Sequence, residues 1–370
     1  MSMNDDQVYY ISKDQFQKLR VDFVKLMDDI ESFLDEALSN GLLTNSNKES
    51  IMSESDSNNQ KRRLHEILGK KLPDGSRKFV SALKKSNHKE ILKLLDDPSV
   101  YPMKFKLHGR VILINNVKFP VGSKYNERLG SEKDVEGITK LFKAFNFEVQ
   151  LYSNKTAEEM EGIIEKASQE STAREDCFVM FLMSHGVRGS IIGTDGKELS
   201  YSTINDALKD TINDDPEKRS PLKDKPKLIY VNTYQFKHEK DNIPKGTDAS
   251  STKENTCRSE TQVKVDAECS SAVESNSEKE YIGQYFNVPD LYVTFASVPE
   301  GLAYRTEESG SFFIKSLISV YERNKDRCDI SSLSLDIKSK VSKEFKEINM
   351  DQVSSCYSTL KRKVILRATD

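Results

Sequence analysis

The chain has 370 residues, a length that predicts two folded units rather than one small domain. Its 56 basic and 59 acidic side chains nearly cancel, which argues against nucleic acid or an anionic membrane as the main partner. The N-terminus is polar, and no stretch reaches the roughly 20 apolar residues that span a bilayer. Five scattered cysteines without a C-x-x-C pair indicate neither a disulfide framework nor a zinc ribbon. We therefore expect a cytoplasmic protein without a metal or cofactor.

Residues 10–97 predict a compact antiparallel bundle of short, charged helices. Apolar residues recur there at spacings of three and four, beginning with Phe16, Leu19, Phe23, Leu26 and Ile30. Turn-forming residues at 40–41 and 73–75 separate the helical stretches. Residues 98–104 contain two prolines, which cannot extend the preceding helix, and predict a linker. The pattern alone fits an interaction module and a plain helical domain equally well.

From residue 105 onward the pattern changes to strands that alternate with amphipathic helices. Strand-like apolar runs occur at residues 111–116, 147–152, 177–183, 227–232, 291–297 and 363–368. Because these runs are continuous rather than alternating, we expect strands that are covered on both faces. The prediction is an α/β sandwich with a central, mostly parallel six-stranded sheet, preceded by the all-α bundle.

Residues 237–280 interrupt this rhythm. The stretch is rich in Ser, Thr, Asn, Lys, Glu and Asp and contains few large aliphatic residues. An insert of this length and composition inside a compact domain predicts a flexible loop.

Chemistry is expected at the carboxyl ends of the strands, where open parallel sheets bind their ligands. The third strand ends in Ser184-His185-Gly186, and the fourth ends at residues 232–235 with Asn-Thr-Tyr-Gln. A histidine fixed by a strand is suited to acid–base work, and the following glycine lets a substrate backbone approach. A single histidine in such a place is, however, more often structural.

Two segments at these strand ends resemble the caspase family. Residues 176–196 read DCFVMFLMSHGVRGSIIGTDG and resemble the segment that carries the caspase histidine. Residues 225–236 read KPKLIYVNTYQF and resemble the segment that ends in the Q-A-C-R-G signature, whose histidine lies about 50 residues upstream. The resemblance makes His185 the catalytic histidine and Gly186 an oxyanion-hole donor, and it puts Tyr234 where caspases have the nucleophilic cysteine.

Two further segments resemble the parts of caspases that form the S1 pocket. The segment NERLGSEKDVEGI, residues 126–138, resembles the R-x-G-x-x-x-D segment and implies that Arg128 belongs to this pocket. The segment GLAYRTEESGSFFIKSL, residues 301–317, implies the same for Arg305, because two guanidinium groups can clamp one aspartate side chain. The remaining substrate-binding positions implied by the resemblance are Asn232, in place of glutamine, and the aromatic residues Tyr304 and Phe312.

The N-terminal bundle resembles a caspase recruitment domain, a module of the death-domain fold. The stretches that carry this resemblance are FLDEALSNGLLT, LHEILGKKLPDGSRKFVSALKKS and HKEILKLL. Together the resemblances imply a recruitment-like domain at 10–97, a linker at 98–104 and a caspase-like domain at 105–370. Within the latter they imply a large-subunit-like part at 105–236, a flexible intersubunit loop at 237–280 and a small-subunit-like part at 281–370.

Tyrosine at position 234 makes peptidase activity by the family's mechanism improbable. A phenol titrates near 10, is larger than a thiol and attacks amides poorly. The leading hypothesis is an inactive caspase homologue in apoptosis or related signalling. It would dock onto an adaptor that contains a recruitment domain, and it would pair with active caspases or with itself through the strand at 363–368. The alternatives are an active Asp-specific cysteine peptidase with a divergent site and a binder of Asp-containing peptides that does not cleave them.

The loop also contains candidate cleavage positions. Residues 263–266 read VKVD, so Asp266 resembles a caspase cleavage position, while Asp241 and Asp248 are weaker candidates. Aspartates also occur in acidic loops by chance.

Overall fold

A computed structural model describes most of the chain. The described residues are 11, 13–72, 74–95, 99–171, 174–209, 221–233, 263–265, 282–298, 303–326, 328–346 and 352–368. They form two compact units, residues 1–106 and 107–370. The boundary between them in the sequence lies two residues beyond the end of the predicted linker. No helix in these ranges combines the length and the apolar character that crossing a membrane requires.

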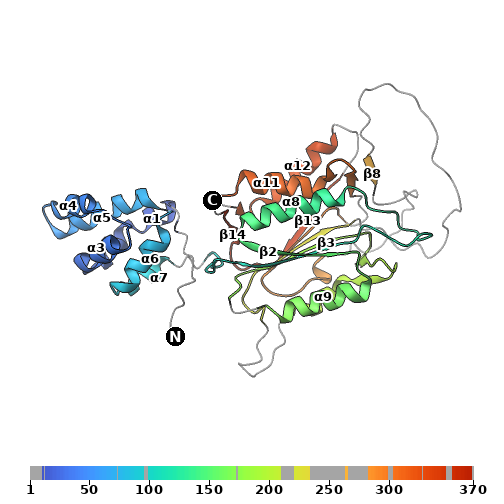
Figure 1. Cartoon of the computed structure of the whole chain (residues 1–370), viewed down its shortest axis with the longest axis horizontal. Helices are drawn as coiled ribbons and strands as arrows, with labels where there is room; N and C mark the ends of the chain where they lie inside the picture. Colours follow the sequence, from blue (N-terminus) through green and yellow to red (C-terminus); the bar gives the residue numbers. More distant parts are fainter. Residues whose placement is uncertain are drawn as a thin grey trace. The chain divides into compact units, whose positions relative to one another are not determined.

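The first unit is a bundle of short helices (Figure 1). They are α1 (Lys13–Lys18), α2 (Arg20–Leu26), α3 (Ile30–Ser39), α4 (Asn45–Met52), α5 (Ser57–Lys71), α6 (Ser76–Lys85) and α7 (Lys89–Leu95). Gly41 has a positive φ of 70° directly after α3, so the predicted turn at 40–41 ends that helix. Their apolar stripes share one core, in which the His65 ring stacks on Phe16 at 4.2 Å.

The second unit is built on a six-stranded sheet with the order β13-β9-β7-β3-β1-β2. Its strands are β1 (Gly109–Asn115), β2 (Phe147–Ser153), β3 (Phe178–Met183), β7 (Lys227–Asn232), β9 (Leu291–Phe295) and β13 (Ser355–Ser358). All neighbours pair in parallel except β13, which is antiparallel to β9. The predicted α/β class and the mostly parallel six-stranded sheet are therefore confirmed.

One strand assignment from the sequence was wrong. The run at 363–368 does not join the main sheet; its residues Ile365–Leu366 form β14, which pairs with β12 (Cys328–Asp329) in a separate two-stranded sheet. The sixth strand is instead β13, with the sequence SCYS. A strand at the sheet edge is only half buried, so it needs no continuous apolar run, and its sequence gives a weak signal.

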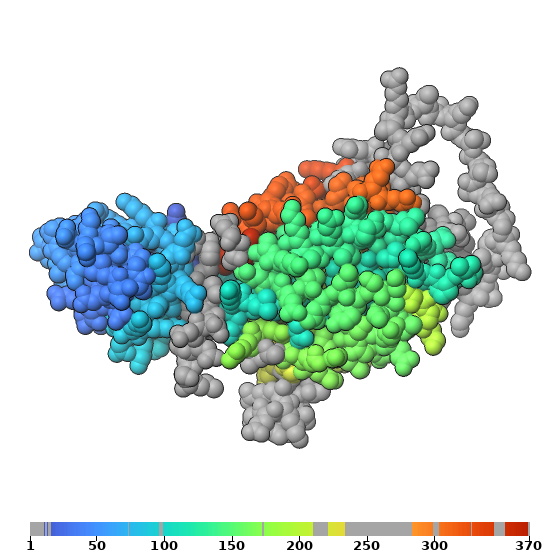
Figure 2. Space-filling model, in the orientation of Figure 1, coloured from blue at the N-terminus to red at the C-terminus, as the bar shows by residue number. Residues whose placement is uncertain are grey.

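Helices cover both faces of the sheet, as the continuous apolar runs predict. Figure 1 shows α8 (Ser131–Ala144), α11 (Phe312–Arg323) and α12 (Ser334–Lys346) on one face and α9 (Ala157–Gln169) on the other. The short helix α10 (Tyr201–Ala207) packs beside α9. In the space-filling view α8 and α11, green and orange, lie side by side (Figure 2).

Short strands surround the carboxyl ends of the main sheet. One three-stranded sheet contains β4 (Gly186–Val187), β5 (Ser190–Ile192) and β6 (Glu198–Ser200). Another contains β8 (Val263–Val265), β10 (Tyr304–Thr306) and β11 (Gly310–Ser311), and a 3-10 helix, η2, spans Ile282–Gln284. The loop predicted at 237–280 therefore contains at least one strand, β8.

An aromatic stack connects the centre of the sheet to the helices above it. Phe181 of β3 stacks on Tyr230 of β7 at 4.4 Å and meets Phe142 of α8 edge-on at 5.3 Å. The Tyr230 hydroxyl lies 3.1 Å from that of Tyr321 in α11, so each of these buried phenols has a hydrogen-bond partner. The stack fixes β3 four residues before His185.

Replacement of Phe181 by alanine should destabilise the second unit. Because the ring is fully buried, Phe181→Ala is expected to lower the free energy of unfolding by about 3–5 kcal/mol in urea denaturation. The matched control is Leu151→Ala on the edge strand β2, where the side chain is 49% exposed, with an expected loss below about 1 kcal/mol. Equal losses for the two variants would contradict this assignment of the core.

Candidate functional site

Two of the predicted site residues that the structure describes, His185 and Asn232, lie where neighbouring strands of the main sheet end. Asn115 of β1 is aligned with Met183 of β3, and Met183 is aligned with Asn232 of β7. Because the three strands are parallel, the segments that follow them leave the sheet at the same edge. His185 follows Met183, the middle residue of these three aligned residues, by two positions.

The His185 ring makes a hydrogen bond and packs against two aromatic rings. Its Nε2 lies 2.7 Å from the carbonyl oxygen of Asn126, and its ring packs against Phe119 (4.9 Å) and Tyr125 (5.2 Å). A carbonyl oxygen only accepts, so Nε2 carries the proton and Nδ1 is the basic nitrogen. Burial, together with the positive charge of Arg128, lowers the pKa of His185 to about 3. The imidazole is thus neutral at physiological pH, and it is a weaker base than a group whose pKa lies near 7.

Arg128 and Arg305 are both buried and are anchored around the loop that precedes α8. Arg128 donates from Nη1 to Asn115 Oδ1 (3.3 Å) and to the carbonyl oxygen of Asn116 (3.0 Å). Arg305 of β10 donates from Nε to the carbonyl oxygen of Leu129 at 2.9 Å. Burial lowers the pKa of Arg128 to about 10 and that of Arg305 to about 9, and both groups remain cationic at neutral pH.

Asp134, in the first turn of α8, supplies the nearby negative charge. Its Oδ1 accepts a hydrogen bond of 2.9 Å from the backbone N–H of Ser311. Burial raises the pKa of Asp134 to about 7, although the Ser311 N–H and the charges of Arg128 and Arg305 favour the ionised form. The charges of Glu132 and Glu307 also act on Arg305, so Asp134 is not its only acidic neighbour. Guanidinium groups are the donors that suit a carboxylate ligand.

Two glycines let the segments of this cluster approach one another closely. Gly130 has a φ of 88°, and a Cβ there would lie 2.3 Å from the carbonyl oxygen of Thr306. Gly310 has a φ of 76°, and a Cβ there would lie 2.4 Å from Asp134 Oδ1. A side chain at either position would separate β10 from the start of α8.

The other predicted residues occupy different parts of this region. Asn232 is buried and donates from Nδ2 to Ser311 Oγ at 3.1 Å, which links it to Asp134 through Ser311. Gly186 begins β4, and Phe312 begins α11. Tyr234, Asp241, Asp248 and Asp266 lie outside the described residues.

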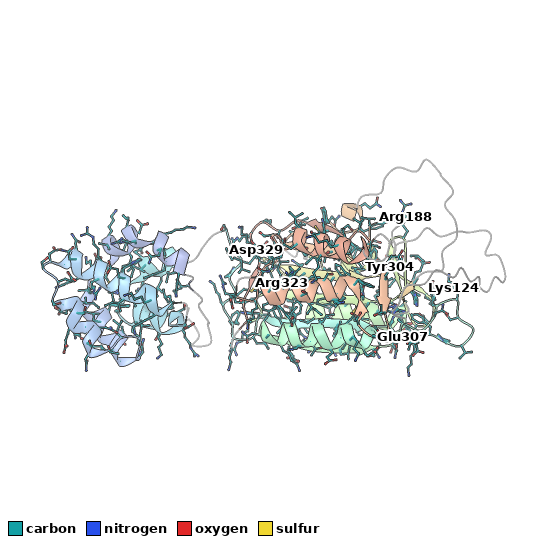
Figure 3. All side chains as sticks on the ribbon, turned by 90° about the horizontal axis from the view of Figure 1, so that it is seen from above. Lys124, Arg188, Tyr304, Glu307, Arg323 and Asp329 are labelled. Atoms are coloured by element: carbon teal, nitrogen blue, oxygen red, sulfur yellow. The ribbon has the colours of Figure 1, made fainter. Side chains whose placement is uncertain are left out.

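Tyr304 is buried, and its backbone N–H donates to Gln352 Oε1 at 3.1 Å. Figure 3 shows Tyr304 toward the same end of the second unit as Lys124, Arg188 and Glu307, whereas Arg323 and Asp329 lie toward the other end. Tyr304 therefore lies toward the end of this unit that is opposite to Arg323 and Asp329.

Sequence reasoning assigned no role to Asp134, Asn115 or the Asn126 carbonyl. A signal existed for Asp134, because it is the last residue of the R-x-G-x-x-x-D segment. A backbone carbonyl has no sequence signal at all, since every residue has one.

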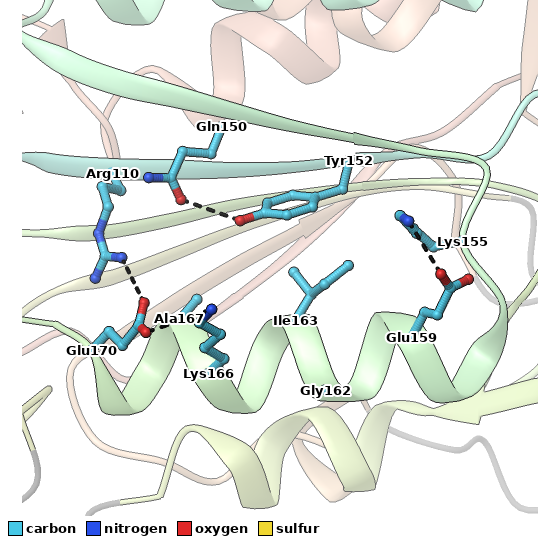
Figure 4. A pocket seen from close by; sticks show the side chains of 10 residues that line it. All are labelled: Arg110, Gln150, Tyr152, Lys155, Glu159, Gly162, Ile163, Lys166, Ala167 and Glu170. Atoms are coloured by element: carbon cyan, nitrogen blue, oxygen red, sulfur yellow. Dashed lines mark hydrogen bonds and ion pairs between the residues drawn. The ribbon is translucent and has the colours of Figure 1, made fainter.

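A surface hollow of about 510 Å³ between β2 and α9 is separate from this site (Figure 4). None of its lining residues is a predicted site residue. Its charges pair with one another, as in Arg110–Glu170 (3.6 Å) and Lys155–Glu159 (3.1 Å). Lys166 also pairs with Glu170, at 3.8 Å, so each of the three basic side chains of the hollow already has a carboxylate partner.

Two regions of the chain match known protein families. Residues 108–365 match the caspase domain of the peptidase C14 family. The chain belongs to the caspase family. Residues 13–97 match the caspase recruitment domain. The bundle of the first unit and the caspase domain of the second are thus both identified.

Several caspases are similar to this chain. Caspase-8 of Mus musculus is 29% identical over 242 residues, which are 63% of this chain and 45% of the relative. Caspase-9 of Homo sapiens is 25% identical over 269 residues, 70% of this chain and 62% of the relative. Caspase-7 of Gallus gallus is 26% identical over 238 residues, 63% of this chain and 66% of the relative. The chain spans about half the length of the caspase-8 proteins that it matches.

The buried neutral state of His185 predicts a pH dependence of the caspase domain's stability. An unfolded histidine titrates near 6.5, so below that pH the unfolded chain binds a proton that the folded chain excludes. Stability is therefore lost as the pH falls. Between pH 7 and pH 5 the wild type should lose about 2 kcal/mol more than His185→Gln, measured by urea unfolding at each pH.

The control for this experiment is His65→Gln, which changes a buried histidine of the recruitment domain. It should leave the pH dependence of the caspase domain's transition as in the wild type. Identical slopes for the wild type and His185→Gln would contradict the assignment of a buried neutral imidazole.

Proposed function

We propose that this chain is a catalytically inactive caspase homologue that regulates active caspases in apoptosis or related signalling. The observation that carries the proposal is the tyrosine at position 234. Residues of β3 and β7 that pair with each other, such as Phe178 and Lys227, are 49 positions apart in the sequence. His185 and Tyr234 have the same separation, which supports the sequence-based assignment of residue 234 to the nucleophile position.

Tyrosine cannot replace the chemistry of a catalytic cysteine at this position. Cysteine titrates near 8.5, and a neighbouring imidazolium lowers that value further, whereas tyrosine titrates near 10. A histidine whose pKa is lowered to about 3 is also poorly able to take the phenol's proton. Loss of a nucleophile from a comparable catalytic set costs about 10⁶ in kcat.

The cysteines that the structure describes do not offer a substitute nucleophile. Cys177 immediately precedes β3, so the length of that strand, about 20 Å, separates it from His185. Burial raises the pKa of the Cys177 thiol far above neutral, and it does the same for Cys328. Cys356 belongs to β13, at the edge of the sheet. Cys257 and Cys269 lie outside the described residues.

Regulation would use both domains. The recruitment domain would dock onto an adaptor with a domain of the same kind, and the caspase domain would pair with an active caspase or with a second copy. The edge of the main sheet formed by β13 is a better candidate for this pairing than the run at 363–368, because an edge strand has backbone groups available to a further strand.

A second candidate function is the capture of Asp-containing peptides without cleavage. The two buried guanidinium groups of Arg128 and Arg305 favour it, because guanidinium groups bind a carboxylate through charge-assisted hydrogen bonds. An active Asp-specific peptidase remains the alternative that the next experiment excludes or revives. Under the inactive reading, any cleavage after Asp266, Asp248 or Asp241 comes from another protease.

Restoration of the thiol should restore cleavage. Tyr234→Cys is expected to raise the rate of hydrolysis of fluorogenic Asp peptides at least about 10³-fold over the wild type, since the missing nucleophile is the larger part of the deficit. The control is Tyr234→Cys combined with His185→Ala, which should return the rate to background. Wild-type turnover that disappears in His185→Ala alone would overturn the proposal of inactivity.

The regulatory part is tested with an active caspase as the reporter. An excess of the intact wild-type chain should change the rate at which that caspase cleaves an Asp peptide, in either direction and by at least about twofold. The substitution Cys356→Pro removes a backbone N–H group from β13 and should weaken the effect on the rate. No change of rate at any ratio of the two proteins would contradict regulation by pairing.

A further inference from the structure

The main sheet has a second edge at β2, opposite to β13. In the strand order β13-β9-β7-β3-β1-β2, β2 pairs with β1 on one side, and no strand of the described residues pairs with its other side. β2 has seven residues, whereas β13 has four. An edge strand presents a row of backbone N–H and C=O groups that a further strand can use.

A hydrogen bond just beyond β2 shows which of its backbone groups point outward. The N–H of Asn154 donates to the carbonyl oxygen of Asn115 at 3.0 Å, so residue 154 is turned toward β1. Along a strand this direction alternates from one residue to the next. The even-numbered residues of β2 therefore face β1, and the N–H and C=O groups of Val149 and Leu151 point away from the sheet.

β2 lacks the features by which sheet edges commonly avoid pairing. Lysine, proline and bulges are such features. The sequence FEVQLYS contains neither lysine nor proline, and Glu148 is its one charged residue. Leu151 is 49% exposed, and Val149, on the same face, is partly exposed. An edge of this length and composition is suited to a partner strand.

The side chains of β2 are complementary to those of a second β2 that runs antiparallel about Gln150. In this register Val149 lies opposite Leu151 of the second copy, and Gln150 lies opposite its own equivalent. Glu148 lies opposite Tyr152, so a carboxylate meets a phenol that can donate to it. No like charges are directly opposite, and the outward groups of residues 149 and 151 meet, as antiparallel hydrogen bonding requires.

A polar row on the α9 face of β2 can extend across such a pair. Gln150 Nε2 donates to Glu148 Oε1 at 3.0 Å. The Tyr152 hydroxyl donates to Gln150 Oε1 at 3.4 Å (Figure 4). The hollow between β2 and α9 leaves space beside Gln150 and Tyr152. Because these three side chains are exposed or partly exposed, they can exchange hydrogen bonds with the same row of a second copy.

We propose that β2 is an interface between two copies of this chain, whose main sheets join antiparallel about Gln150. This surface is distinct from β13, since the two edges are about 24 Å apart across the sheet. A pair formed through β2 leaves both β13 edges available, so it can hold two further partners at once. The inference goes beyond regulation through β13 and does not depend on catalytic inactivity.

The contact through β2 is small, and we expect it to be weak between free chains. Stable interfaces use about 20–30 residues a side, and β2 supplies seven. Chains brought together by their recruitment domains would have an effective concentration on the order of 1 mM, which favours a weak contact. Pairing through β2 is therefore expected to accompany docking of the recruitment domains.

Disulfide cross-linking in the full chain tests the register. In a non-hydrogen-bonded antiparallel pair the Cα atoms are about 4.5 Å apart, a distance that a disulfide can bridge. With oxidised glutathione as the oxidant, Gln150→Cys should therefore give at least about fivefold more disulfide-linked dimer than the wild type. Mass spectrometry should place the bond between the two copies of position 150.

The matched control is Glu148→Cys, on the same face of the same strand. In the proposed register the two copies of position 148 are about 14 Å apart along the strands, which a disulfide cannot bridge. This variant should give no more linked dimer than the wild type.

Two further variants distinguish the two sheet edges. Leu151→Pro removes an outward N–H group and spares the hydrogen bonds to β1. In the Gln150→Cys background it should reduce the linked dimer to the wild-type level, whereas Cys356→Pro should leave the linked dimer in place. Without any oxidant, amide exchange at residues 147–153 of the wild type should slow as the protein concentration rises.

Several outcomes would overturn the inference. One is a yield of linked dimer in Gln150→Cys no higher than in Glu148→Cys, and another is its loss in Cys356→Pro. Amide exchange at 147–153 that is independent of concentration is a third. A disulfide within one chain, between position 150 and a native cysteine, would show that the chain's own segment covers the edge. Failure of the regulatory proposal leaves these readouts unchanged, because none of them uses an active caspase.

Discussion

The buried cluster of Arg128, Arg305 and Asp134 is the constraint on which the rest of the site depends. Arg128 and Asp134 belong to one segment, Arg305 comes from β10, which is distant in the sequence, and each of the three is held by backbone groups of its neighbours. Buried guanidinium groups are tolerated only where their charge is compensated and their hydrogen bonds are made. Glycine at 130 and 310 permits the close approach that this requires.

The cluster and the reactive centre are separable parts of the same site. Peptide binding depends on charge and on an open strand edge, whereas cleavage needs a thiolate beside a proton acceptor. If Tyr234 stands at the nucleophile position, as we propose, the second requirement is lost and the first is retained. The fold of a caspase can in this way be retained for recognition after its chemistry is lost.

The sequence by itself determined the class of both units. Continuous apolar runs predicted strands covered on both faces, and the ends of those runs predicted that His185 and Asn232 lie at the same edge of the sheet. These features are local, because backbone geometry sets the period of a strand or helix. Burial on one or two faces then decides which positions are apolar. Charged residues in recognisable segments likewise indicated Arg128 and Arg305 before any contact was known.

Only the tertiary structure decided which segments pair across long distances. It assigned the sixth strand to β13 instead of residues 363–368, because a half-exposed edge strand has no distinctive apolar pattern. It also joined Asp134 to the two arginines, oriented the His185 ring on the carbonyl of Asn126, and brought β8 to β10. Backbone carbonyls and strand edges are common to every residue, so their partners depend on the fold and not on the local sequence.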